Sequence, residues 1–323
     1  MKKILCIFIL SALLLGLAAC GEAEPALPRD GKPVIVTTLF PAYDFARQIA
    51  GERAEVILLV PPGAEAHSFE PTARDMIRIQ ESSLFFCNGG ESEAWVEELL
   101  EDQQIETLRM LDCVDALEEE TVEGMQAVPE HAHEEHDHAH EEHEEEGPEY
   151  DEHVWTSPVN AEKICVALCE RLCQMDPEGA DYYRANLARY CAELEVLDAA
   201  FRQTVEQGQR RTLVFADRFP VRYFVEEYGL RYYAAFPGCA DDTEPSARTV
   251  AFLIDKVRDE QIPAVFVIEF SNEKMADVIC EDTGCGKLRF HSCHTVSAED
   301  LENGVTYLEL MWENVAALKE ALN

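Results

Sequence analysis

The chain has 323 residues, of which 64 are Asp or Glu and 26 are Lys or Arg, so its formal net charge is −38 at pH 7. A surface this acidic repels nucleic acid and anionic lipid, which excludes nucleic acid as a partner, and it attracts cations. A chain of this length exceeds one typical hydrophobic core and predicts two domains or one large one.

The first residues predict an export signal. Lys2 and Lys3 precede an apolar run over residues 4–19, which has the length of a signal-peptide core and is short for a membrane span. The run ends in Leu-Ala-Ala before Cys20, which resembles the lipobox of bacterial lipoproteins, where the cysteine is acylated after cleavage. We therefore expect a signal peptide over residues 1–19, a lipid anchor on Cys20, a linker over residues 20–32, and an extracytoplasmic protein held at the cell membrane. An ordinary secretory signal with a chance cysteine is the alternative.

Strands and helices alternate in the first part of the chain. Short apolar runs predict strands, and segments with helical periodicity follow them. The expected strands are residues 33–38, 54–60 and 82–87, and the expected helices are residues 40–49 and 71–80. This alternation is typical of a parallel sheet covered by helices.

Residues 118–152 interrupt this pattern with 16 acidic residues and no Lys or Arg. The segment has too little apolar surface to fold, and we expect a disordered His/Glu-rich loop. Interleaved imidazoles and carboxylates offer many weak, exchangeable sites, so the loop predicts an accessory metal-gathering tract, with a solvated linker as the alternative. Its histidines are His131, His133, His136, His138, His140 and His143.

The alternation resumes after two helical segments, at residues 160–175 and 180–207. The second of these would be about 40 Å long at 1.5 Å per residue, enough to join two lobes. The expected strands that follow are residues 212–216, 232–236, 264–270 and 287–290, and the expected helices are residues 221–228, 246–259, 272–283 and 304–322. We therefore predict an α/β fold of two lobes, each a mainly parallel sheet flanked by helices, joined by one long rigid helix. The predicted parts are residues 33–175, the linker helix at residues 176–208, and residues 209–323.

Cysteine is abundant, with ten residues beyond Cys6 and Cys20. An even number in an exported protein suggests disulfides. Cys165, Cys169 and Cys173, however, fall on one helical face, where adjacent thiols are poorly placed to bridge each other. For these three cysteines we favour small buried core residues over disulfides. A metal site formed by them ranks below both.

Four further histidines lie at or just after the ends of predicted strands or in the loops that follow: His67, His153, His291 and His294. Ligands of α/β sheets bind outside the carboxyl ends of strands, so these side chains could converge. Neutral imidazole suits zinc and related late first-row metals, and carboxylates complete such sites. A structural histidine is the alternative for each of them taken singly.

Taken together, these features resemble a known family. The segments HSFEPT (67–72) and DEHVWTSP (151–158), the lipobox, the His/Glu insertion, the long central helix and the tail GVTYLELMWENVAALKEAL are similar to the substrate-binding proteins of zinc and manganese ABC transporters. The resemblance runs from about residue 34 to residue 322. It implies a metal cleft between the lobes, with one ligand from each of four segments, and His67 and His153 match the first two ligand positions.

The third and fourth positions depart from the family's pattern. The third usually has a His or Glu before an Asp, and here Ala216 precedes Asp217. The fourth, usually acidic, aligns with His291, so a site of His67, His153 and His291 would preserve zinc chemistry.

The fourth ligand of such a three-histidine site would then be Asp217, Glu269, His294 or water. Arg218 and Arg222 are expected to compete for Asp217 in a salt bridge. Only a sharp turn would let both His291 and His294 face one ion, so His291 ranks first, and Cys293 is a soft alternative ligand.

The predicted function is that of a high-affinity zinc receptor that delivers metal to an ABC transporter permease, as a monomer with Zn2+ as its ligand. A manganese (Mn2+) receptor of the same type and a surface lipoprotein that sequesters metal or acts as an adhesin are the alternatives. A zinc hydrolase with Glu269 as general base is disfavoured, because no HExxH helix, nucleophile elbow or phosphate loop occurs in the sequence.

Overall fold

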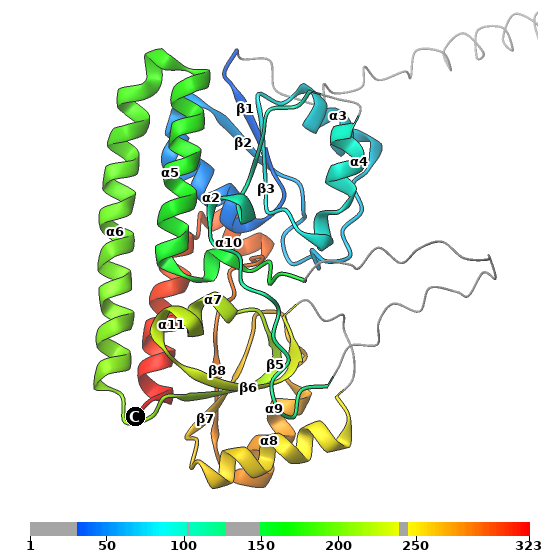
Figure 1. Ribbon diagram of the computed structural model, residues 1–323, viewed down its shortest axis with the longest axis vertical. Coiled ribbons are helices and arrows are strands. Elements are labelled where there is room, and N and C mark those ends of the chain that lie inside the picture. The colour runs from blue at the N-terminus through cyan, green and yellow to red at the C-terminus, as the bar shows by residue number, and fades with distance from the viewer. Residues whose placement is uncertain (1–30, 102–103, 127–148, 239–244) are drawn as a thin grey trace, which may run out of the picture.

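The computed structural model describes residues 31–101, 104–126, 149–238 and 245–323 (Figure 1). The predicted signal peptide, Cys20 and the histidines of residues 131–143 lie outside this part of the chain, so these remain predictions. Among the described helices, none is long and apolar enough to cross a membrane.

The first sheet has four parallel strands in the order β2-β1-β3-β4. β1 and β3 are buried along their whole length, as expected of strands covered by helices on both faces. The strands are β1 (Val34–Thr37), β2 (Glu55–Leu58), β3 (Leu84–Cys87) and β4 (Thr107–Arg109), and the helices are α2 (Phe40–Ala50), α3 (Ala73–Glu81) and α4 (Trp95–Glu101). Apolar runs in the sequence predicted the first three strands, whereas neither α4 nor the short, half-buried β4 was predicted.

The second sheet repeats this arrangement, with four parallel strands in the order β6-β5-β7-β8. The strands are β5 (Thr212–Phe219), β6 (Arg231–Pro237), β7 (Ala264–Val267) and β8 (Gly286–Arg289), and the helices are α7 (Arg222–Tyr228), α8 (Ala247–Asp259) and α9 (Lys274–Thr283). β5 continues past its predicted end at residue 216, whereas β7 stops before residue 268. Glu269 therefore belongs to a loop rather than to a strand.

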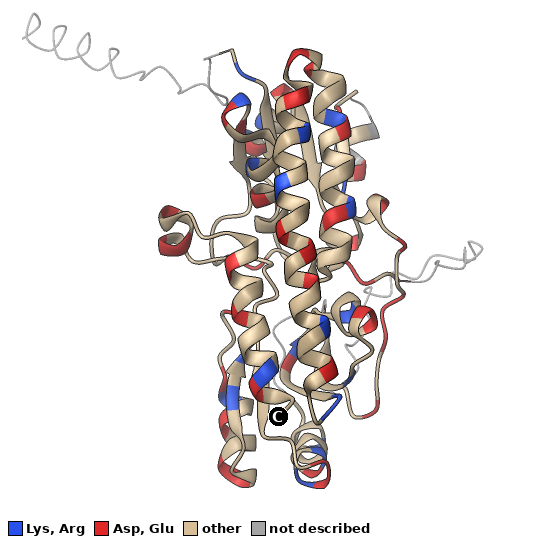
Figure 2. Cartoon of the chain, turned by 90° about the vertical axis from the view of Figure 1, so that its left-hand side faces the viewer, with Lys and Arg blue, Asp and Glu red and all other residues tan. Residues whose placement is uncertain are grey.

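Two long helices, α5 (Pro158–Met175) and α6 (Ala180–Gln207), pack side by side, and α6 runs alongside both lobes (Figure 1). Figure 2, which views this side, shows charged residues spread along their outward faces. The inner face of α6 joins a hydrophobic core that reaches into both halves. Its fully or nearly fully buried side chains are Tyr183, Tyr190, Leu194, Leu197 and Phe201. The predicted fold of two α/β lobes joined by one long helix is confirmed, whereas the predicted residue limits of the domains remain a prediction.

The closing helix begins later than predicted. The expected helix at residues 304–322 is preceded by α10 (Ala298–Asn303), which ends at Gly304 with a φ of 77°. Thr306 then starts α11 (Tyr307–Ala321) through a capping box with Glu309. Short 3-10 helices complete the elements: η1 (Gly51–Arg53), η2 (Glu91–Glu93), η3 (Leu111–Cys113), η4 (Val154–Thr156) and η5 (Pro177–Gly179).

Asp44 is a buried carboxylate between α2 and α11. Its Oδ2 accepts the N–H of Tyr307 at 2.9 Å, and its Oδ1 accepts the side-chain amide of Gln48 at 3.4 Å. Burial outweighs these hydrogen bonds and raises the pKa of Asp44 from 3.8 to about 6. A carboxyl group whose pKa is higher in the folded state binds more protons there than in the unfolded chain. Asp44 therefore costs stability as the pH rises through this window.

We expect Asp44→Asn to remove this pH-dependent cost. The free energy of unfolding of the variant, relative to that of the wild type, should rise by roughly 3 kcal/mol from about pH 4 to about pH 7, as measured by urea denaturation at a series of pH values. Gln48→Leu is the control, because it removes a hydrogen bond and leaves the titrating group in place. A difference between Asp44→Asn and wild type that does not change with pH would contradict the assignment.

Candidate metal centre

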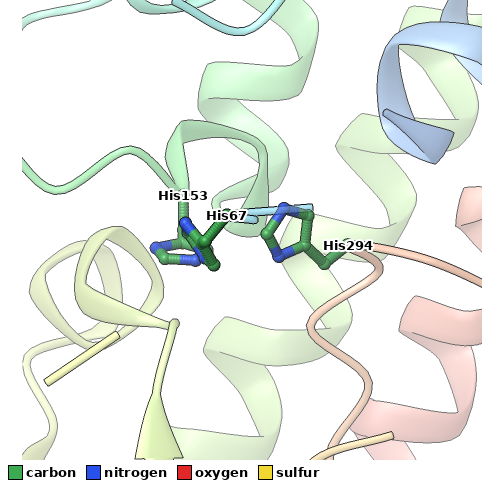
Figure 3. Close-up of side chains that lie close together, drawn as sticks. All are labelled: His67, His153 and His294. Atoms are coloured by element: carbon green, nitrogen blue, oxygen red, sulfur yellow. The ribbon is translucent and has the colours of Figure 1, made fainter. Parts of the chain in front are cut away.

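Three histidines from distant segments meet between the two sheets (Figure 3). They are His67 from the loop after β2, His153 at the start of η4, and His294 from the loop after β8. Each offers a ring nitrogen, and these nitrogens all lie within 4.8 Å of one another. Their ring centroids are 4.9 to 5.6 Å apart. The group therefore has the size of the ligand set around a single ion.

The three rings line a cavity of about 160 Å³. Its walls come from the loops that follow β2, β6, β7 and β8, together with Arg218 of β5. Both lobes therefore contribute, as expected at the carboxyl ends of parallel strands. The volume suits one ion with a few water molecules.

His153 is fully buried and has one free ring nitrogen. Its backbone N–H and its ring Nδ1 both contact Asp151 Oδ1, at 2.9 and 3.2 Å. The contact with the carboxylate assigns the proton to Nδ1 and leaves the lone pair on Nε2, which has no partner in the described structure. Carboxylates orient metal-binding histidines in this way. An unpartnered buried acceptor is costly unless something binds it, so Nε2 fits a metal ligand.

His294 is placed by a loop that Glu269 holds from the inside. The Glu269 carboxylate accepts hydrogen bonds from the Ser292 N–H at 2.7 Å, the Ser292 hydroxyl at 2.6 Å and the His294 N–H at 3.2 Å. Trp155 Nε1 donates to the Ser292 carbonyl at 2.7 Å, and its ring packs against the His294 ring. Glu269, a candidate ligand in the sequence analysis, therefore supports the loop instead and is not one of the three clustered residues.

His291 lies outside the group, although the sequence analysis ranked it above His294. Its Nε2 is 3.0 Å from the Glu313 carboxylate on α11. The side chain of Asn314 accepts the His291 N–H at 2.7 Å and donates to the His291 carbonyl at 2.8 Å. The chain then turns at Cys293, whose φ is 61°, and this turn brings His294 to the cavity. The structure thus places His294, and not His291, in the group of three histidines.

Asp217 also lies outside the group. Its carboxylate accepts the N–H of Arg218 at 2.8 Å and that of Ile268 at 3.2 Å, which ties β5 to the loop after β7. Ala216, at the departure from the family pattern, packs into the apolar core of the second lobe. Neither residue is positioned to complete the set of three histidines.

Arg218 and Arg222, which were predicted to compete for Asp217, both form ion pairs with glutamates. Arg218 pairs with Glu65, at 2.9 Å, and Arg222 pairs with Glu120 and Glu226. Burial alone would raise the pKa of Glu65, but the charge and the hydrogen bond of Arg218 outweigh it and hold this pKa below its ordinary value. The sequence offered no signal for the Glu65–Arg218 pair, because the two residues are 153 positions apart.

Burial favours the neutral forms of His67 and His294. It lowers the pKa of His67 to about 4, with a further lowering from the neighbouring His153. Burial and the other two rings also lower the pKa of His294 well below its ordinary value. Neutral rings present lone pairs, and three nitrogen donors with room for a fourth ligand fit the tetrahedral geometry that zinc prefers.

Comparison with known proteins assigns the family. The chain matches the model described as zinc-uptake complex component A, periplasmic, over residues 35–321. The high-affinity zinc uptake system protein ZnuA of Bacillus subtilis is 31% identical over 327 residues, covering 99% of this chain and 98% of that protein. The zinc-binding lipoprotein AdcA of Streptococcus pneumoniae is 31% identical, and this chain spans 61% of its length. The manganese-binding lipoprotein MntA of Halalkalibacterium halodurans is 26% identical over 327 residues.

Solved structures agree with this assignment. The Zn(II)-bound ZnuA-like domain of AdcA from Streptococcus pneumoniae superposes with a TM-score of 0.72 at 28% identity, covering 90% of this chain and 99% of that one. The metal-dependent lipoprotein YcdH of Bacillus subtilis superposes with a TM-score of 0.73 at 27% identity and the same coverage. The matching family and ZnuA are named as zinc-uptake components, in agreement with the prediction that the chain is not an enzyme. The chain therefore belongs to the family of periplasmic zinc-uptake components, the substrate-binding proteins of zinc and manganese ABC transporters.

Proposed function

We propose that this protein is the zinc receptor of an ABC transporter for metal uptake, and that it binds one zinc ion through His67, His153 and His294. The observation that carries the proposal is the group of three imidazoles, with ring nitrogens within 4.8 Å of one another and a buried His153 Nε2 that has no partner in the described structure. Water or another small ligand fills the fourth position. The ion is the cargo, and a permease receives it.

The donor set favours zinc over manganese. Manganese prefers carboxylate, carbonyl and water oxygens, and it is the weakest binder among first-row divalent metals at nitrogen sites. The carboxylates of Asp217 and Glu269 are engaged with backbone N–H groups, and neither belongs to the group of three histidines. The manganese alternative is therefore less favoured for this chain.

The proposal also covers where the protein is located and what its His/Glu-rich loop does. Cys20 carries a lipid anchor, the protein works outside the cytoplasm as a monomer, and the histidines of residues 131–143 collect metal for the cleft. Relatives named as lipoproteins and as a periplasmic component support this location. Deleting residues 130–146 should slow metal acquisition and leave tight binding in place. Complete loss of the tight site on this deletion would contradict the division of labour.

Calorimetry with zinc and manganese tests the central claim. The measurement uses the chain from Gly21 onward without the His-rich tract. The same chain with His67→Ala is measured for comparison. One tight zinc site that is lost in His67→Ala supports the receptor. The absence of a tight site would instead favour a surface protein that sequesters metal weakly.

Zinc binding should resist acid more than a simple histidine site does. Protons compete with the metal only below the pKa of each imidazole, and the pKa of His67 is about 4. We expect proton competition at His67 and His294 to weaken zinc binding little from about pH 7 to about pH 5, and each of these two rings to cost about tenfold in affinity per pH unit below its pKa. Competition against a chelator of known proton affinity measures this profile. A loss of about thousandfold per pH unit that begins near the ordinary histidine pKa of about 6.5, as if all three rings titrated there, would contradict it.

A further inference from the structure

An ion pair lies on the wall of the cavity, beside the three histidines. Glu65, in the loop that carries His67, and Arg218, in β5 of the second lobe, both line the cavity. Arg218 Nη1 is 2.9 Å from Glu65 Oε2, and the Arg218 side chain is only 17% exposed. A guanidinium beside a site for a cation opposes the cation electrostatically, so its presence calls for a specific role.

Both oxygens of the Glu65 carboxylate are occupied. Oε2 accepts from Arg218, and Oε1 accepts the backbone N–H of His67 at 3.4 Å. The nearest acidic side chain on the His67 loop is therefore engaged by the opposite lobe. A carboxylate two residues from His67 would otherwise be within reach of an ion held by that histidine.

We propose that Arg218 is a selectivity residue of the metal site: it holds Glu65 away from the ion and so keeps the protein ligands to three imidazole nitrogens. This inference rests on the proposed function. Zinc binds well to three nitrogens and a water molecule, whereas manganese gains most from a carboxylate oxygen and a larger coordination number. The repulsion by Arg218 acts on both divalent ions alike. The preference therefore comes from the withheld carboxylate.

The test compares zinc and manganese affinities of the full chain, by competition against chelators, in four forms. Arg218→Met keeps the length of the side chain and frees Glu65, and it should narrow the preference for zinc over manganese by about tenfold or more. Arg218→Lys keeps a cation for Glu65 and should stay close to wild type. The double variant Arg218→Met/Glu65→Gln removes the freed carboxylate and should restore the wild-type ratio.

Two results would overturn the inference. One is an unchanged ratio in folded Arg218→Met, and the other is a narrowed ratio that persists in the double variant, because Arg218 would then act by charge alone. Glu65→Gln in the wild-type background is a second check, and it does not depend on whether the Arg218→Met variant folds. It should leave zinc affinity nearly unchanged, whereas a large loss would mean that Glu65 already binds the ion. Failure of wild type to bind zinc tightly would count against the proposed function instead.

A second, independent observation concerns two cysteines of the second lobe that are not part of the histidine group. Cys280, near the end of α9, has its Sγ 3.5 Å from the Sγ of Cys285, which immediately precedes β8. Gly284, with a φ of 78°, turns the chain back between them. The geometry points to a disulfide between Cys280 and Cys285 in the protein outside the cytoplasm.

The bond would form by exchange with an external disulfide, such as oxidised glutathione or a thiol oxidoreductase. One of the two thiols loses its proton, and its thiolate attacks the reagent, forms a mixed disulfide and releases one thiol of the reagent. The other thiol then loses its proton, attacks the cysteine sulfur of the mixed disulfide and releases the second thiol of the reagent. In total two thiols are oxidised, and the reagent is reduced to two thiols.

Treatment of the full chain with oxidised glutathione, followed by alkylation and peptide mapping, tests the bond. We expect one peptide that carries both Cys280 and Cys285, with neither alkylated, and its loss in Cys285→Ser. Cys169 and Cys173 serve as the internal comparison, because one turn of the α5 helix separates them. Full alkylation of Cys280 and Cys285 after oxidation would overturn the assignment.

Discussion

Replacing His294 with alanine should abolish tight zinc binding. His294 supplies one of three ring nitrogens, and two imidazoles from separate loops hold an ion far less well than three. Changing a residue that only supports a ligand already costs about 10- to 100-fold in affinity, so removal of a ligand should cost at least about 100-fold. Calorimetry with zinc measures the loss directly.

His291→Ala is the matched control for this experiment. It lies three positions away in the same loop, but it contacts Glu313 and Asn314 of α11. We expect zinc affinity to stay within a few fold of wild type. The opposite result, tight binding in His294→Ala and its loss in His291→Ala, would return His291 to the place that the sequence alone suggested.

The contrast between these two histidines shows where prediction from sequence stops. Strand ends indicated that four histidines could converge, and the structure brings together His67, His153 and His294. The choice between His291 and His294 depends on the left-handed backbone at Cys293 and on Asn314, 23 positions from His291. Such contacts are tertiary and leave no local pattern.

The fold was more accessible than the site. Parallel strands buried on both faces are continuous apolar runs, and Ile35, Phe85 and Phe266 mark three of them. β4 escaped detection because Thr107, Leu108 and Arg109 form no such run and are only half-buried. Helical periodicity likewise placed α6, whereas the start of α11 depended on a capping box at Thr306.

The site is also a structural link between the lobes. His67 belongs to the first lobe and His294 to the second, and His153 lies close to both rings. An ion bound to all three would join the lobes across the cavity. Release of such an ion would therefore require that at least one of these loops move.

The loop that carries His294 depends on Glu269, and Glu269→Ala should damage both stability and binding. The substitution leaves the Ser292 N–H and the Ser292 hydroxyl without their acceptor, and it leaves the His294 N–H with the Ser292 hydroxyl oxygen alone. Since an unsatisfied buried donor costs about 1–3 kcal/mol, we expect the free energy of unfolding of the metal-free protein to fall by roughly 2 kcal/mol or more. Zinc affinity should fall by about 10- to 100-fold, because the loop no longer orients the ring.

The metal-free measurement distinguishes support from ligation. His294→Ala removes a ligand and should leave the metal-free protein nearly as stable as wild type, whereas Glu269→Ala should lower the unfolding midpoint in urea before any zinc is added. Glu269→Gln keeps one acceptor oxygen and should fall between wild type and Glu269→Ala in both measurements. If Glu269→Ala lost zinc binding with no change in the stability of the metal-free protein, Glu269 would have to bind the ion itself, and the loop would need another support.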